Sequence, residues 1–274
     1  MKTAVSIGKC VILARGLGTR MRREDAGARL NAAQAAAAGA GLKAMIPVGR
    51  PFLDYVLSAL ADAGFQQACL VIGPEHEAVR EYYTRTVNPK RIEIGFAIQP
   101  RPLGTANAVI AAEEFAGADE FLVINSDNYY PAEALAAIQN LGRPGTILFE
   151  AAALMREGNI PAERIPAFAY CVVDGDGFLA DIVEKPVPVA SPGFESKKLV
   201  SMNCWRFGPD IFAACREVRR SPRGELELPL AVKLAIGKGM KLRAAICRAG
   251  VLDLSRRSDI AGVTARLGKL QVQL

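Results

Sequence analysis

The stretch CVILARGLGTRMRRED, residues 10–25, runs from apolar residues into a glycine-rich turn and then into a cluster of arginines. The short apolar run predicts a buried strand, and Gly16 and Gly18 predict a tight turn at its end. Glycines let backbone N–H groups approach an anion closely, and arginine adds a fork of charged donors. The stretch therefore predicts an α/β fold with an anion-binding loop; an ordinary turn with solvated arginines is the alternative.

Strand and helix patterns alternate through the first half of the chain. Apolar, β-branched runs predict strands at residues 10–14, 68–73, 92–98 and 120–127. Apolar residues at helical spacing predict helices at residues 51–64, 75–83 and 105–115. This order predicts a mainly parallel sheet covered by helices on both faces, with ligands bound at the carboxyl ends of its strands.

The second half of the chain has a different rhythm. Two apolar runs around the sequence DGDG, within residues 168–186, predict an antiparallel hairpin. Further strands are expected at residues 199–207 and 241–247, and no long linker separates the two halves. We therefore expect one domain over residues 1–274, a Rossmann-like three-layer sandwich with a mixed, mostly parallel central sheet. The alanine-rich segment 31–41 predicts either a short helix or a mobile loop.

Composition narrows the classes of function. No run approaches the roughly 18 uncharged apolar residues of a membrane span, and no cleavage site follows the N-terminal residues. We expect a cytoplasmic protein that does not bind membranes. The six cysteines include no CxxC pair, so neither a zinc site nor a disulfide framework is indicated. His76 is the only histidine and is expected at the surface, so any metal must be held by carboxylates, which favours magnesium or manganese.

The net charge of +6 suits either nucleic acid or small phosphorylated ligands. The sequence has no basic stripe interleaved with aromatic residues and no motif of a nucleic-acid-binding module. We therefore expect small phosphates, and no nucleic acid, as binding partners.

Two common phosphate loops fit the opening stretch poorly. The Walker pattern GxxxxGK[ST] is absent, and the dinucleotide pattern GxGxxG has Met21 at its third glycine. A dinucleotide-dependent oxidoreductase is therefore disfavoured. The longer string ARGLGTRM, residues 14–21, remains, with Arg20 directly after the turn.

That string is the first of several motifs along the chain. LKAMIPVGRPFLDYVLSAL begins at residue 42, QPRPLGTANA at 99, NSDN at 125, EKP at 184, SPRGELEL at 221 and GVLDL at 250. In this order they resemble the sugar-1-phosphate nucleotidyltransferases, the family of glucose-1-phosphate thymidylyl- and uridylyltransferases, over nearly the whole chain. Three departures stand out. Arg15 replaces the first glycine of the family's GG pair, the alanine-rich insert follows the loop, and Asp253 lacks its usual tryptophan and TGT neighbours.

The resemblance implies that a phosphate oxygen of a sugar 1-phosphate attacks the α-phosphorus of an NTP, so that an NDP-sugar forms and pyrophosphate leaves. It implies a nucleotide-binding half over residues 1–130 and a sugar-phosphate-binding half over residues 131–274. It also implies that Asp127 and Asp253 hold Mg²⁺ between the two substrates.

The resemblance assigns further roles residue by residue. The expected catalytic residues are Arg20, Lys43, Asp127 and Lys185. The expected nucleotide-binding residues are Ala14, Gly16, Gly18, Thr19, Gln99, Gly104 and Thr105. The expected sugar-phosphate-binding residues are Glu184, Lys185, Asn203 and Glu225. We also expect residues 24–42 to form a mobile flap that becomes ordered over the triphosphate.

The choice of base is expected to depend on Gln99, which in the resembled family pairs with the pyrimidine. A glutamine amide can donate to a carbonyl and accept from a ring N–H at once, which suits uracil and thymine. UTP or dTTP is therefore favoured. GTP is the alternative, because PLGTA at residues 102–106 also resembles the guanylyltransferase form of this segment. A regulatory subunit without activity is a further alternative, and the sugar and a homo-oligomeric state stay open.

Overall fold

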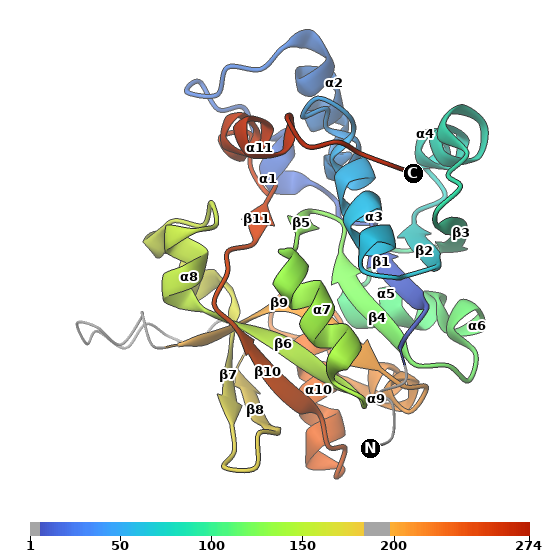
Figure 1. Ribbon diagram of the computed structural model, residues 1–274, viewed down its shortest axis with the longest axis vertical. Coiled ribbons are helices and arrows are strands. Elements are labelled where there is room, and N and C mark those ends of the chain that lie inside the picture. Colours follow the sequence, from blue (N-terminus) through green and yellow to red (C-terminus); the bar gives the residue numbers. More distant parts are fainter. Residues whose placement is uncertain (1–5, 184–197) are drawn as a thin grey trace.

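Nine strands form one mixed sheet in the computed structural model, which describes residues 6–183 and 198–274 (Figure 1). Seven of these strands follow the order β10-β6-β9-β4-β1-β2-β3, and β7 and β8 extend the sheet from β9. Their bounds are β1 (Lys9–Leu13), β2 (Gln67–Ile72), β3 (Glu93–Ile98), β4 (Phe121–Asn125), β6 (Gly145–Glu150), β7 (Ala169–Val173), β8 (Leu179–Val183), β9 (Leu199–Phe207) and β10 (Arg243–Cys247).

The strand directions confirm the predicted mixed, mostly parallel sheet. β1 is parallel to β2 and β4, β2 is parallel to β3, and β6 is parallel to β10. β9 runs antiparallel to β4 and β6, and the β7–β8 hairpin joins it antiparallel. The carboxyl ends of β1 to β4 therefore meet at one edge of the sheet, where an α/β fold binds its ligands.

Two hydrophobic cores, one on each face of the sheet, make the fold a three-layer sandwich (Figure 1). One core contains side chains of α3 (Phe52–Asp62), α7 (Ala132–Asn140) and α11 (Asp259–Leu267). The other contains side chains of α5 (Thr105–Ala111), α9 (Ile211–Glu217) and α10 (Leu228–Gly237). The expected three-layer architecture is confirmed.

Shorter helices connect these elements. Their bounds are α1 (Thr19–Arg22), α4 (Glu77–Glu81), α6 (Glu113–Ala116), α8 (Ala151–Arg156) and the 3₁₀ turns η1 (Lys43–Met45) and η3 (Ala162–Ala167). The helix predicted at 75–83 ends at Glu81 and widens into a π-helical turn, η2 (Tyr82–Val87). The hydroxyls of Tyr82 and Tyr83 both donate to the buried carboxylate of Asp54 at 2.9 Å, which stabilises that turn.

The alanine-rich segment forms a helix, α2 (Ala32–Ala40). Asn31 and Gln34 make a reciprocal capping box at its start, and Gly41 ends it in the left-handed conformation. The side chain of Gln34 also donates to the Pro47 carbonyl at 2.9 Å. Of the two predicted alternatives for residues 31–41, the short helix is confirmed.

Two very short strands lie outside the main sheet. β5 (Asn128–Tyr129) and β11 (Leu252–Asp253) pair antiparallel, with Asp253 opposite Asn128. This pair joins the residues after β4 to a segment near the end of the chain, beside the edge where β1 to β4 end (Figure 1).

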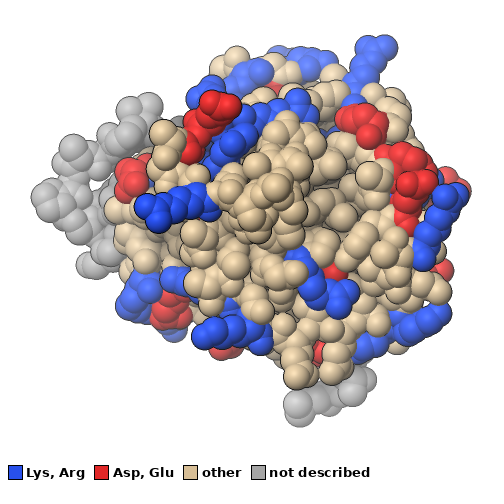
Figure 2. Space-filling model, turned by 90° about the horizontal axis from the view of Figure 1, so that it is seen from above, with Lys and Arg blue, Asp and Glu red and all other residues tan. Residues whose placement is uncertain are grey.

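The surface view from above shows Lys and Arg side chains dispersed among acidic and uncharged ones on that face (Figure 2). They are not gathered into one continuous basic stripe there. None of the helices in the described part of the chain combines the length and the apolar character that crossing a bilayer requires.

Candidate active site

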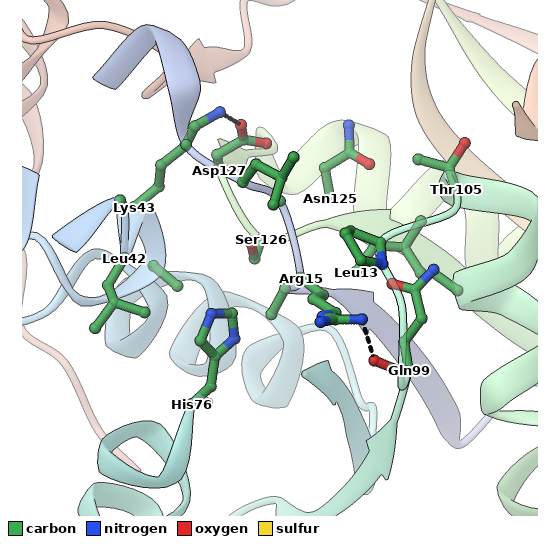
Figure 3. Close-up of a pocket in the computed structure, with 18 of the residues that line it drawn as sticks. Leu13, Arg15, Leu42, Lys43, His76, Gln99, Thr105, Asn125, Ser126 and Asp127 are labelled. Carbon is green, nitrogen blue, oxygen red and sulfur yellow. Dashed lines mark hydrogen bonds and ion pairs between the residues drawn. The ribbon is translucent and has the colours of Figure 1, made fainter. Parts of the chain in front are cut away.

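A cavity of about 390 Å³ lies at the carboxyl ends of β1, β3 and β4 (Figure 3). Most of the predicted site residues line it: Ala14, Gly16, Gly18, Thr19, Arg20, Lys43, Gln99, Gly104, Thr105, Asp127 and Glu225. They come from segments far apart in the sequence, and the parallel strands bring them to one edge of the sheet. Their binding roles stay predictions.

The loop after β1 is held close to the end of α2. Gly18 has a φ of 61°, and a Cβ at this position would lie 2.5 Å from the Gly41 carbonyl oxygen. Only glycine fits a left-handed backbone with another backbone this close. The loop therefore presents its backbone to the cavity, followed by the exposed side chains of Thr19 and Arg20. Among the described residues, no carboxylate pairs with the Arg20 guanidinium, so its donors face the cavity unpaired.

Lys43 and Asp127 form an ion pair at one end of the cavity (Figure 3). The Nζ of Lys43, on the 3₁₀ turn η1, lies 2.7 Å from Oδ2 of Asp127, which follows β4. Their side chains are 15% and 19% exposed, so both are accessible from the cavity. The ion pair holds the Lys43 ammonium beside the Asp127 carboxylate.

Asp253 lies next to Asp127 through the β5–β11 pair. The N–H of Leu254 donates to the Asp127 carbonyl at 2.8 Å, and Nδ2 of Asn128 donates to Oδ2 of Asp253 at 3.2 Å. Asp253 is almost fully buried, and Arg164 donates to its Oδ1. Burial raises the pKa of Asp253, the neighbouring charge of Asp127 raises that pKa further, and Arg164 lowers it. The carboxylates of Asp127 and Asp253 are thus brought together, and Arg164 forms an ion pair with Asp253.

The two aspartates are the carboxylates at which a magnesium ion shared with a ligand is expected. Mg²⁺ is usually bound by one or two carboxylates together with substrate phosphates and water. The described residues, 6–183 and 198–274, contain no cluster of three or more metal-ligating side chains. Asp253 is not among the residues that line the cavity, and its two carboxylate oxygens accept hydrogen bonds from Arg164 and Asn128. A magnesium ion held by Asp127 and Asp253 stays a prediction.

The other end of the cavity contains Gln99 and Gly104. A Cβ on Gly104 would lie 2.5 Å from the Leu226 carbonyl oxygen, and the φ of 119° also requires glycine. The Nε2 of Gln99 donates to the Gly104 carbonyl at 3.1 Å and to Oδ1 of Asn107 at 2.9 Å. Both amide hydrogens of Gln99 are therefore occupied. The expectation that this amide donates and accepts at once must be corrected, because in this geometry it offers a ligand only an acceptor.

The predicted sugar-phosphate residues have different outcomes. Glu225 lines the cavity, 3.3 Å from Arg223, which also lines it. Asn203 does not line the cavity. Its Nδ2 lies 3.5 Å from Oδ1 of Asn125, and Asn125 does line the cavity. Glu184 and Lys185 lie outside the described residues.

The sequence analysis missed several residues of this site. Arg15 lines the cavity, and its replacement of a family glycine was the available signal. His76, expected at the surface, also lines the cavity, and its side chain is only 11% exposed. Its burial lowers the pKa of the imidazole, and its Nδ1 accepts a hydrogen bond from the Gly73 N–H at 3.3 Å. A lone histidine in a polar segment carries no sequence pattern that could have placed it here.

The chain is similar to known sugar-nucleotide enzymes. It is 27% identical over 254 residues to a UTP–glucose-1-phosphate uridylyltransferase of Haloferax volcanii, covering 92% of this chain and 93% of that protein. It is 28% identical over 267 residues to a glucose-1-phosphate thymidylyltransferase of Streptomyces antibioticus. That alignment covers 93% of this chain and 65% of the longer Streptomyces enzyme.

A solved structure shows the same fold. UTP-bound UGPase from Acinetobacter baumannii has a TM-score of 0.71 at 18% identity, covering 95% of this chain and 93% of that chain. The family model of nucleotidyl transferases matches residues 39–260, which is most of this chain. The protein therefore belongs to the nucleotidyl transferase family, together with its uridylyl- and thymidylyltransferase relatives, and is a nucleotidyltransferase.

Proposed function

We propose that this enzyme joins an NTP to a sugar 1-phosphate, forming an NDP-sugar and pyrophosphate, and that it prefers UTP or dTTP. The observation that carries the proposal is the convergence of Arg20, Lys43 and Asp127 in one cavity at the carboxyl ends of β1 and β4. The names of the uridylyl- and thymidylyltransferase relatives support the same reaction class.

In the proposed reaction, an oxygen of the sugar phosphate forms a bond to the α-phosphorus of the NTP. The bond from that phosphorus to the oxygen bridging to the β-phosphate breaks, and pyrophosphate leaves with the electron pair. The attacking oxygen is already an anion, so the site needs no strong general base. It must bring two polyanions together and hold them in line. The lining side chains suit this task, with four cations (Arg15, Arg20, Lys43 and Arg223) against two carboxylates (Asp127 and Glu225).

Each group near the phosphates has a proposed task. The backbone of the loop from Gly16 to Thr19 and the guanidinium of Arg20 bind the β- and γ-phosphates and stabilise the leaving pyrophosphate. Lys43, which lies beside Asp127, binds the phosphates near the α-position. Mg²⁺ held by Asp127 and Asp253, when bound, would neutralise charge on the reacting phosphates.

A panel of nucleotides tests this function directly. We expect pyrophosphate release when the chain is mixed with Mg²⁺, a sugar 1-phosphate and UTP or dTTP, with lower rates for GTP, ATP and CTP. The acceptor on Gln99 suits the ring N–H of uracil and thymine and disfavours cytosine and adenine, whose ring nitrogens at that position are acceptors. The names of the uridylyl- and thymidylyltransferase relatives favour UTP or dTTP over GTP. A coupled assay of pyrophosphate, repeated with several sugar 1-phosphates, measures it.

The same panel separates the alternatives. A clear preference for GTP would contradict the pyrimidine assignment but not the reaction, since guanine also carries a ring N–H beside a carbonyl. Binding of an NTP without pyrophosphate release from any sugar 1-phosphate tested would favour a regulatory subunit over an enzyme.

Hydrogen exchange tests the predicted flap at residues 24–42. Because α2 is capped at both ends, we expect the gain in protection on NTP binding to fall mainly in the loop before it. Residues 22–27 of that loop are exposed, and Arg22 already donates to the Ala40 carbonyl at 2.9 Å. The edge strand β10, which contributes no residue to the cavity, should show the same exchange in both states. Equal protection of the loop with and without NTP would rule out a closing flap.

A further inference from the structure

Arg15 occupies a fixed position at the end of the cavity away from Asp127. Its side chain is 7% exposed and follows directly from the carboxyl end of β1. Its Nη1 donates to the Gln99 carbonyl oxygen (Figure 3). Its Nε and Nη2 lie 3.2 Å from the carboxylate of Glu75. The guanidinium is therefore held on two sides before any ligand binds.

The strand order explains which part of a nucleotide this arginine would meet. β1, β2 and β3 are neighbours in parallel, and their carboxyl ends lead to Arg15, to Glu75 with His76, and to Gln99. The proposed phosphate and metal groups, Lys43 and Asp127, lie at the other end of the cavity, beyond β1 on the side of β4 (Figure 3). The position of Arg15 therefore favours the base over the phosphates.

The hydrogen bonds of Gln99 leave this end of the cavity without an amide donor for a base carbonyl. Its amide hydrogens are used by Gly104 and Asn107, so its Oε1 can accept from a ring N–H, but the amide cannot donate to the adjacent base carbonyl. A guanidinium has five N–H donors. The contacts with Glu75 and Gln99 leave one hydrogen on Nη1 of Arg15 without a partner among the described residues.

We propose that Arg15 is a base-specificity residue whose Nη1 donates to the carbonyl at C4 of the pyrimidine, next to the ring N–H from which Gln99 accepts. Glu75 is then a positioning residue that orients the guanidinium. The pair selects bases with adjacent N–H and C=O groups, such as uracil, and rejects cytosine, whose ring nitrogen is an acceptor beside an amine. This inference rests on the proposed function, in which the cavity binds an NTP with its base beside Gln99.

UTP and CTP form a matched pair of probes, because they differ only at the two ring positions that Arg15 and Gln99 would contact. Titration calorimetry of each nucleotide with the full chain gives the ratio of their dissociation constants. We expect Arg15→Met to reduce the preference for UTP by about 10-fold or more, the range of a hydrogen bond from a charged donor. The loss should come from weaker UTP binding, with the CTP affinity nearly unchanged.

Three further variants isolate the cause. Arg15→Lys keeps the charge but loses the planar fork, so it should also lose the preference if recognition is directional. Glu75→Gln should reduce the preference less than Arg15→Met, since it removes only the orienting charge. Arg101→Met is the control, because Arg101 is exposed and does not line the cavity. The preference of this variant for UTP over CTP should match that of the wild type.

Each contrary result has a distinct meaning. If Arg15→Met leaves the ratio of the UTP and CTP dissociation constants unchanged, Arg15 does not recognise the base. If the wild-type chain releases pyrophosphate from UTP while that ratio is unaffected, only the role of Arg15 is overturned. A wild-type chain that neither binds nor turns over any NTP overturns the proposed function and this inference together.

Discussion

Replacing Asp127 with asparagine is expected to slow NDP-sugar formation by about 100-fold or more while leaving the chain folded. Loss of a preorganised electrostatic group in an active site has effects of about this size. Asp127 is part of the cavity wall, and its partner Lys43 is accessible from the same cavity. Asparagine keeps the shape but removes the charge that would hold Mg²⁺. Steady-state turnover at saturating Mg²⁺ measures the loss.

Asp210→Asn is the matched control. Asp210 is exposed and follows β9, which runs antiparallel to β4, so it lies at the opposite edge of the sheet from Asp127. The turnover of Asp210→Asn should equal that of the wild type. Asp210→Asn and Asp127→Asn should both unfold at nearly the same temperature as the wild type. A folded Asp127→Asn chain with a near-normal rate would contradict the metal assignment.

Replacing Arg164 with methionine is expected to destabilise the protein by about 3–5 kcal/mol at neutral pH, the cost of leaving buried charges without their counterion. Arg164 is 5% exposed and bridges two carboxylates, Asp253 and Asp259, the latter at 2.8 Å. Asp259 in turn accepts from the backbone N–H groups of Ser255 and Arg256 at 2.9 and 2.7 Å. Without Arg164, the Asp253 carboxylate is still buried and still repelled by Asp127, but it has lost its counterion. Urea unfolding of both chains measures the difference.

The pH dependence of that difference has a definite sign. In the wild type, burial and Asp127 raise the pKa of Asp253 above its ordinary value, and Arg164 opposes them. Removing Arg164 raises the pKa further, so the folded variant binds a proton more tightly than its unfolded chain does. The destabilisation relative to the wild type is therefore largest above this pKa and shrinks as the pH falls through it. A difference that stays constant with pH would show that lost packing, not charge, is responsible.

A surface arginine provides the comparison. Arg156 is 65% exposed and pairs with its neighbour Glu157. Arg156→Met removes the same charge and side-chain type but should change the free energy of unfolding by less than about 1 kcal/mol, because exposed ion pairs contribute little. A large effect at Arg156 would mean that net charge, rather than the buried bridge, controls stability.

The sequence alone determined the elements whose signals are local. The strands β1 to β4 and the helix α3 were predicted to within a few residues, because a run of apolar residues or a helical period is visible along the chain. The strand β9 has the bounds that its pattern predicted. The loop of Gly16 and Gly18 was located because it directly follows such an apolar run. Lys43, Gln99 and Asp127 were placed at the site by the resemblance of their motifs to those of the sugar-1-phosphate nucleotidyltransferases, and all three line the cavity.

Only the tertiary structure decided which charged groups meet. Asn128 and Asp253 are 125 positions apart and are joined by strands of two residues each, too short to have a periodic pattern. The bridge from Arg164 to Asp253 and the clamp of Arg15 between Glu75 and Gln99 likewise join separate segments. An ion pair depends on the distance between two side chains after folding, and no local periodicity encodes that distance. The position of the glycine loop after β1 could therefore be predicted from the sequence, whereas the ion pairs and hydrogen bonds around the cavity could not.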